Sequence, residues 1–182
     1  MRLLFVFFIM LLPVTAAAQD MSLLKQPGVV ALMRHALAPG TGDPANFELG
    51  DCATQRNLDA RGRDQARRVG QAMRDAGVAF DHVWTSQWCR ARDTAELVDM
   101  GEVVERPSLN SHFAGRGDRA AQTADTLDSI AKLPADARVL MVTHFVNISA
   151  LTGQGASSGE IVVARRDGRG GLEVLGRIEI AP

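Results

Sequence analysis

The sequence has 182 residues, with 20 Lys or Arg and 21 Asp or Glu, which give a formal net charge of -1 at pH 7. This length suits one domain with a sizeable core and is short for two domains. The arginines are interleaved with acids rather than gathered in a basic block, which argues against a nucleic-acid partner. Lys25 and Lys132 are the only lysines. The excess of arginine favours bidentate binding of phosphate or carboxylate groups.

The N-terminal residues have the three parts of a secretory signal peptide. Arg2 supplies the positive charge, residues 3–14 form an apolar run, and small residues lead up to Ala18. We expect a signal peptide over residues 1–18, a single domain over residues 19–182, and a periplasmic or secreted location. The apolar run is well short of the roughly 20 residues that span a bilayer, so we expect no stable membrane anchor.

The first strand signal ends in an arginine and a histidine. Residues 29–33 are uncharged and include two adjacent valines, which is typical of a fully buried strand, and Arg34 and His35 follow directly. Ligands of open α/β sheets bind beyond the carboxyl ends of strands, so the pair is expected where chemistry is usually done. The next stretch, Leu37 to Gln55, is rich in Pro and Gly and is predicted to be a long loop.

Helical and extended patterns alternate through the middle of the chain. We expect helices over residues 60–76, 87–100 and 118–132, short strands over residues 83–85 and 103–104, and a loop over residues 108–117. Asp59 is expected to cap the first of these helices and Ser86 the second. This alternation predicts an α/β fold.

A second strongly apolar strand, over residues 138–143, also ends in a histidine, His144. A short helix is expected over residues 145–151. The chain then ends in a predicted hairpin of residues 161–164 and 172–180. Two buried strands that each deliver a histidine at the carboxyl end are expected to place both imidazoles at one site.

Four residues, namely Arg34, His35, Arg90 and His144, form the candidate catalytic set. Arg90 lies near the start of the predicted helix 87–100, whose N-terminus favours an anion. Guanidiniums, imidazoles and a helix N-terminus together favour a dianion such as a phosphate monoester. The matching chemistry is phosphoryl transfer, in which a neutral imidazole attacks phosphorus and fixed positive charge stabilises the transition state.

Two cysteines, Cys52 and Cys89, would enter an oxidising compartment after export, where a pair tends to form a disulfide. Two free thiols remain possible, because spacing does not show whether the Cα atoms come close enough. Metal binding is less expected, since the chain has no CxxC or His-rich partner pattern.

The motifs in their order resemble those of the histidine phosphatase superfamily, which also contains the phosphoglycerate mutases. They are Arg34-His35, then a Ser-x-x-x-Arg-x-x-x-Thr-Ala pattern from Ser86 to Ala95, then Thr143-His144, with a helix start at residues 58–66 that is similar to the family's Leu-Thr-x-x-Gly-x-x-Gln-Ala segment. The similarity extends from about Val29 to Val163.

The resemblance implies a role for each matching residue. His35 would become a transient phosphohistidine, Arg34 and Arg90 would clamp the phosphoryl oxygens, and His144 would complete the pocket. The family needs no metal or organic cofactor, and its fold is a three-layer α/β/α sandwich with a mostly parallel central sheet. Arg56 and Asn147 are further candidates for binding the substrate at the pocket rim.

The chain departs from the family pattern at three points. Ala36 replaces the usual glycine after the histidine. Ser111 stands where many members have a glutamate that protonates the leaving oxygen, and His112, Asp118 and Asp51 are candidate replacements. The chain also has little length for the insertions that cover the site in mutases, which argues for hydrolysis over intramolecular transfer.

We therefore expect an exported, cofactor-independent phosphatase that hydrolyses a phosphate monoester or a phosphoramidate. The resemblance suggests phosphorylated envelope sugars, such as lipopolysaccharide core heptose phosphates, or small phosphorylated metabolites as substrates. The alternatives are a phosphomutase and a phosphate-binding protein that has lost turnover, and the sequence does not define the oligomeric state.

Overall fold

The computed structural model describes residues 21–182, so the predicted signal peptide lies outside the described residues. Over these residues the regular elements are six strands and four α-helices, with short 3₁₀ turns between them. In chain order they are β1 (Val29–Arg34), α1 (Ala60–Asp75), β2 (His82–Thr85), α2 (Cys89–Val98), β3 (Val103–Glu105), α3 (Arg119–Ala131), β4 (Val139–Thr143), α4 (Phe145–Thr152), β5 (Ile161–Arg166) and β6 (Leu172–Ile178).

The strands form one mixed sheet in the order β3-β2-β4-β1-β5-β6. The pairings among β3, β2, β4 and β1 are parallel, whereas β5 pairs antiparallel with both β1 and β6. The expected α/β sheet is confirmed, with its parallel part at β3-β2-β4-β1 and the predicted C-terminal hairpin at one edge.

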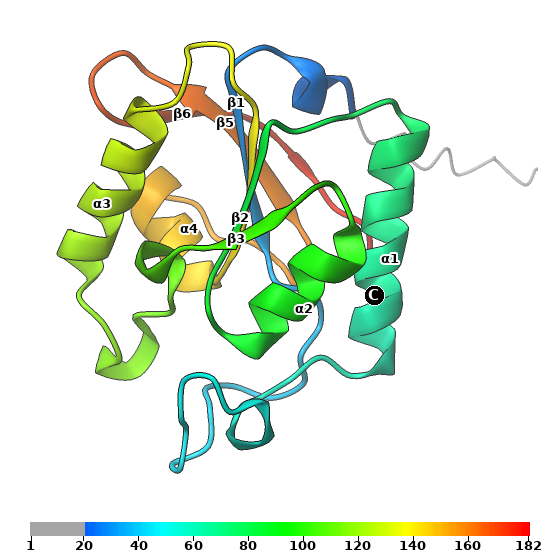
Figure 1. Cartoon of the computed structure of the whole chain (residues 1–182), viewed down its shortest axis with the longest axis vertical. Helices are drawn as coiled ribbons and strands as arrows, with labels where there is room; N and C mark the ends of the chain where they lie inside the picture. Colours follow the sequence, from blue (N-terminus) through cyan, green and yellow to red (C-terminus); the bar gives the residue numbers. More distant parts are fainter. Residues whose placement is uncertain (1–20) are drawn as a thin grey trace, which may run out of the picture.

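Helices cover both faces of the sheet, so the expected three layers are present. Figure 1 shows α1 and α2 on one side of the sheet and α3 and α4 on the other. Successive residues of β1 alternate between the two resulting cores: Met33 packs with the α1 and α2 side, and Leu32 with the α3 and α4 side. Both faces of β1 are buried over residues 29–33, which are apolar without interruption, as a strand covered on both sides requires.

The second motif helix begins later than expected. Ser86 does not cap the predicted helix 87–100; α2 starts at Cys89, and its N-cap residue Trp88 makes no side-chain cap bond. Asn110 causes the difference, because its Oδ1 accepts hydrogen bonds from Ser86 Oγ, at 3.2 Å, and from the Gln87 backbone N–H, at 2.8 Å. These two residues are thereby held in a turn before the helix.

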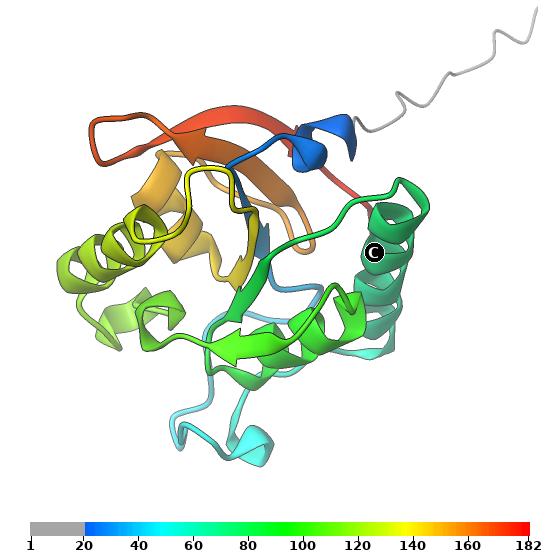
Figure 2. The ribbon, with the colours of Figure 1, turned by 45° about the horizontal axis from the view of Figure 1, so that its top comes forward.

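The carboxyl ends of β1, β2 and β4 meet at one edge of the sheet, and the long loop of residues 37–57 projects there (Figure 2). A disulfide between Cys52 and Cys89, with a Cα–Cα distance of 5.7 Å, ties this loop to the first residue of α2. Within residues 21–182 no helix is both long and apolar enough to cross a membrane.

The start of α1 fixes the chain just after His35. Gln65 Oε1 accepts a hydrogen bond from the Leu37 backbone N–H at 3.0 Å. A Cβ at Gly62 would come within 1.9 Å of the Leu37 carbonyl oxygen, so only glycine allows this close approach. The Gly and Gln of the helix-start motif therefore hold the backbone that carries the first histidine.

Candidate active site

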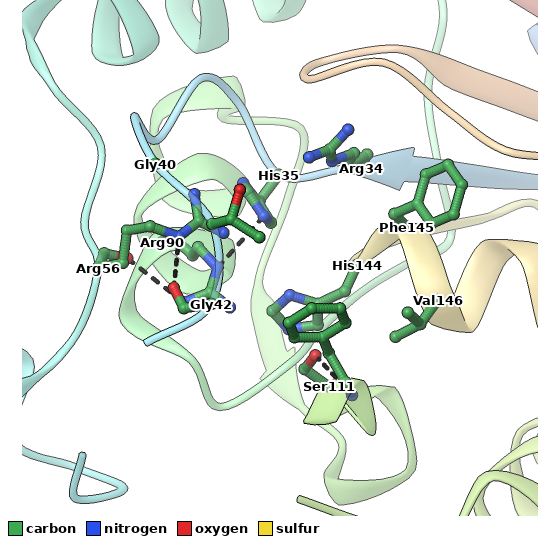
Figure 3. Close-up of a pocket in the computed structure, with 12 residues that line it drawn as sticks. Arg34, His35, Gly40, Gly42, Arg56, Arg90, Ser111, His144, Phe145 and Val146 are labelled. Carbon is green, nitrogen blue, oxygen red and sulfur yellow. Dashed lines mark hydrogen bonds between the residues drawn. The ribbon is translucent and has the colours of Figure 1, made fainter. Parts of the chain in front are cut away.

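A cavity of about 280 Å³ opens at the carboxyl edge of the parallel strands. It contains all four candidate catalytic residues, and Figure 3 shows the two imidazoles near its centre. The complete lining is Arg34, His35, Gly40, Thr41, Gly42, Arg56, Arg90, Ser111, Phe113, His144, Phe145 and Val146.

His35 is buried, and its hydrogen bonds define its tautomer. Nδ1 lies 2.8 Å from the Ala36 carbonyl oxygen, and because a carbonyl only accepts, Nδ1 carries the proton. Nε2 is left with its lone pair and accepts a hydrogen bond from Arg90 Nε at 3.2 Å. Burial, together with the positive charge of Arg90, lowers the pKa of His35 well below its ordinary value. The imidazole is therefore neutral, and Nε2 has the unprotonated lone pair that a nucleophile requires.

Arg90 is held by a buried carboxylate that the sequence analysis did not single out. Asp43, from the long loop, accepts hydrogen bonds from Nη1 at 2.6 Å and from Nη2 at 3.2 Å. Burial alone would raise the pKa of the Asp43 carboxyl, but the hydrogen bonds and charge of Arg90 outweigh it and hold that pKa below its usual range. Trp88 Nε1 and the Arg56 backbone N–H also donate to the carboxylate.

His144 faces His35 across the cavity, with the two ring centroids 5.4 Å apart. Its Nε2 lies 2.9 Å from Ser86 Oγ, and the Ser86 hydroxyl donates to Asn110 Oδ1. His144 Nε2–H must then be the donor to Ser86, which leaves Nδ1 as the free-base nitrogen. Burial, followed by the neighbouring His35 and the arginines, lowers the pKa of His144 well below its ordinary value.

The other two arginines, Arg34 and Arg56, donate hydrogen bonds to backbone carbonyls around the cavity. Arg34 Nη1 donates to Ala156 O at 2.9 Å, while Arg34 Nε is buried without a hydrogen-bond partner. Arg56 donates through Nε to Gly42 O at 2.7 Å and through Nη1 to Ala38 O. Burial, with the nearby Arg90, lowers the pKa of Arg56 to about 10. Arg56 lines the cavity, and its hydrogen bonds also hold the long loop.

Asn147 does not lie on the cavity surface. It is buried behind the wall, where Nδ2 donates to Asn110 O at 2.9 Å, whereas its neighbours Phe145 and Val146 line the cavity. The reason is the helical phase of α4, which turns position 147 toward Asn110, the residue that follows the 3₁₀ turn Pro107–Leu109. The prediction that Asn147 binds substrate at the rim is corrected by this placement.

None of the three candidates for the missing acid lines the cavity. Asp51 and Asp118 are N-caps: Asp51 accepts from the Ala53 N–H, and Asp118 from the Ala121 N–H. His112 carries a buried Nδ1 without a hydrogen-bond partner, and it too is outside the lining. Ser111 does line the cavity, at the position where the family pattern has its acid.

Among residues 21–182, no three His, Cys, Asp or Glu side chains are grouped as a metal site would require. The arrangement instead offers three guanidiniums and two neutral imidazoles around one small space. Such a set binds a tetrahedral oxyanion and presents a nitrogen nucleophile to it.

Comparison with known proteins agrees with this geometry. Residues 30–116 match the family model described as histidine phosphatase superfamily (branch 1). Over this stretch, which is just under half of the chain, the sequence resembles this superfamily. The matched stretch includes Arg34, His35 and Arg90 but ends before His144, whose assignment to the site rests on the cavity.

Two relatives and one solved structure illustrate the similarity. An uncharacterized protein of Picosynechococcus sp. is 32% identical over 111 residues, which are 61% of this chain and 62% of that protein. The mitochondrial serine/threonine-protein phosphatase Pgam5 of Drosophila willistoni is 37% identical over 52 residues, 29% of this chain and 18% of its own. The protein histidine phosphatase SixA, solved with tungstate, has a TM-score of 0.60 at 20% identity, covering 83% of this chain and 96% of that one.

Sequence reasoning missed two residues of this site. Thr94, noted only as part of a motif, accepts a hydrogen bond from the Ala36 N–H through Oγ1 at 3.0 Å, and so links the motif helix to the residue after His35. Asp43 lies in a Gly-Asp-Pro segment of the long loop. The surplus of arginine around the site was the one signal that a buried carboxylate was needed to balance it.

Proposed function

We propose that the protein is a cofactor-independent phosphatase that hydrolyses a phosphate monoester or a phosphoramidate through a phosphohistidine at His35. The observation that carries this proposal is the state of His35: a buried, neutral imidazole with Nε2 unprotonated and 3.2 Å from a buried arginine. In a neutral imidazole, Nε2 can act as the nucleophile only when the proton is on Nδ1, as it is here.

In the first step, the Nε2 lone pair of His35 would form a bond to phosphorus while the bond from phosphorus to the leaving atom breaks. A phosphoryl oxygen then replaces Nε2 as the acceptor of the Arg90 Nε–H, and the leaving group takes a proton from solvent. Arg34 and Arg56 add positive charge, which stabilises the oxygens in the transition state. In the second step water attacks phosphorus, the bond to Nε2 breaks, and phosphate is released with His35 regenerated.

The test is phosphate release from phenyl phosphate or phosphoramidate by the purified chain. Its rate is compared with that of His35→Ala and with that of His82→Ala, a matched control outside the cavity. We expect wild type and His82→Ala to release phosphate and to carry acid-labile, base-stable phosphate after rapid quenching. His35→Ala should do neither. Phosphate release by His35→Ala at the wild-type rate would overturn the proposal.

We also propose that the protein is exported. The three-part N-terminal pattern of the sequence and the Cys52–Cys89 disulfide support this, because disulfides persist in oxidising compartments. Expression in a Gram-negative host followed by fractionation would test it. A periplasmic chain that starts near residue 19 is expected, and a full-length cytoplasmic chain would contradict the proposal.

A further inference from the structure

The cavity has two chemically different parts. Its inner part is formed by the arginines and imidazoles, whereas Phe113, Phe145 and Val146 give it an apolar outer part. In Figure 3, Phe145 and Val146 lie to the right of the histidines, and Arg56 and Arg90 to their left. Phe113 and Phe145 are each 46% exposed, and they are two of the four large hydrophobic side chains that are exposed among the described residues. Two of these four exposed apolar side chains therefore line the same small cavity.

Each phenyl ring lies beside a glycine. A Cβ at Gly155 would come within 2.5 Å of the Phe145 ring, so this ring lies directly against the bare backbone. The Arg34 guanidinium stands 5.8 Å from the centroid of the same ring. On the other wall, a Cβ at Gly42 would be in contact with the Phe113 ring at 3.8 Å. The two exposed rings at the opening offer apolar surface to a flat group.

The described lining contains no carboxylic acid that could protonate a leaving group. Asp43 is near, but both of its oxygens are used: Oδ1 accepts from Arg90 and from the Arg56 N–H, and Oδ2 accepts from Arg90 and Trp88. Ser111 occupies the position of the family acid, and a serine hydroxyl is a poor proton donor. General acid catalysis contributes about 10²- to 10⁴-fold, so this site favours substrates that do not need it.

We propose that the substrates are aryl phosphates, in which the aromatic ring packs against Phe145 and Phe113 and leaves as a phenol. This inference rests on the proposed phosphatase activity. A phenolic hydroxyl has a pKa of about 10, as in tyrosine, and is a far better leaving group than an aliphatic alcohol. The attack of His35 Nε2 breaks the phosphorus–oxygen bond, and the phenolate takes its proton from water. For a sugar phosphate, by contrast, the hydroxyl side chains of the described lining are Thr41 and Ser111, and Ser111 Oγ already accepts a hydrogen bond from the Phe113 N–H.

Three probes test the proposal: phenyl phosphate, glucose 6-phosphate and phosphoramidate, the last of which has no ring. We expect wild type to hydrolyse phosphoramidate and phenyl phosphate, and to hydrolyse glucose 6-phosphate with a kcat/KM at least about 100-fold below that of phenyl phosphate. In Phe145→Leu and Phe113→Leu, the ratio of kcat/KM for phenyl phosphate to that for phosphoramidate should fall about three- to tenfold, the usual value of an aromatic contact. The matched control is Val104→Ala, an exposed apolar residue on β3, in which the ratio should stay the same.

The outcomes separate this inference from the phosphatase proposal. Hydrolysis of phosphoramidate without hydrolysis of phenyl phosphate would overturn the aryl phosphate assignment and leave the phosphatase proposal standing. Equal rates on glucose 6-phosphate and phenyl phosphate, or an unchanged ratio in both leucine variants, would also overturn it. No hydrolysis of any probe by a folded wild-type chain would overturn both.

Discussion

Asp43 and Arg90 form a bidentate ion pair at the edge of the active-site cavity, with their side chains only 4% and 3% exposed. Asp43 occupies the Nη1 and Nη2 positions of the guanidinium, and this leaves the Nε–H directed at His35. One edge of the arginine is therefore committed to the protein, and the other edge faces the nucleophile. The long loop, through Asp43, sets the orientation of the group expected to bind phosphate.

Asp43→Ala should lower the free energy of unfolding by about 3–5 kcal/mol, because it leaves a buried guanidinium without its counter-charge. Urea denaturation followed by circular dichroism measures the change. The matched control is Asp128→Ala, which breaks the exposed pair of Asp128 with Lys132 and should cost less than about 1 kcal/mol. Similar small losses in both variants would show that the Asp43–Arg90 pair contributes little.

Ser86→Ala should lower kcat about 10- to 100-fold and change KM much less. Ser86 Oγ accepts the hydrogen bond from His144 Nε2, so its removal frees the imidazole to rotate away from its position opposite His35. Small displacements of a catalytic group have effects of this size. Steady-state kinetics with phenyl phosphate or phosphoramidate provide the measurement.

The control for Ser86→Ala is Ser129→Ala on α3, outside the cavity lining, which should keep the wild-type kcat. A kcat for Ser86→Ala equal to that of wild type would show that Ser86 does not position His144. A 10- to 100-fold rise in KM with an unchanged kcat would point instead to a role of Ser86 in substrate binding alone.

The backbone rules of α/β sheets were sufficient to bring the main site residues together from the sequence. Residues after β1 and β4 had to meet because these strands are parallel neighbours, with Arg34 opposite Thr143 in the register. Arg90 follows from the first turn of α2. The residue types at these points were already visible as strand ends and a helix start, so the local pattern determined their placement.

The parts that sequence reasoning did not find depend on contacts between distant segments. Asp43 is an ordinary loop residue until the fold places it against Arg90, 47 positions away. Ser86 is a residue type that often caps helices. Here its hydroxyl instead donates to Asn110 Oδ1, 24 residues further along the chain, and its oxygen accepts from His144 Nε2. Asn147 directly follows the lining residues Phe145 and Val146, and only the phase of a short helix turns it inward.

Removal of the disulfide by the double change Cys52→Ser and Cys89→Ser should lower the free energy of unfolding by about 4 kcal/mol. The bond closes a loop between residues 37 positions apart, and the closure of a loop of that length is worth about this much in the chain-entropy model. Urea denaturation with and without a reductant measures it. The reductant should destabilise wild type and leave the double variant unchanged.

Counting free thiols tests directly whether the disulfide forms. Intact mass measured before and after alkylation of the exported protein should show no free thiol in the oxidised sample. Two alkylated cysteines, or a wild-type stability that does not respond to reductant, would mean that Cys52 and Cys89 are not joined in solution.

The two buried histidines should make the protein less stable as the pH falls below about 6.5, the pKa of histidine in an unfolded chain. Burial keeps the pKa of both His35 and His144 well below that value in the folded state, so between the two values only the unfolded state binds protons. The free energy of unfolding should then decrease on acidification by up to about 1.4 kcal/mol per pH unit for each histidine, and should not depend on them above pH 7. Urea denaturation at intervals from pH 7.5 to pH 5.0 measures the slope. His35→Asn and His144→Asn should each reduce this slope, and a stability that stays constant or rises on acidification would contradict the burial of neutral imidazoles in this site.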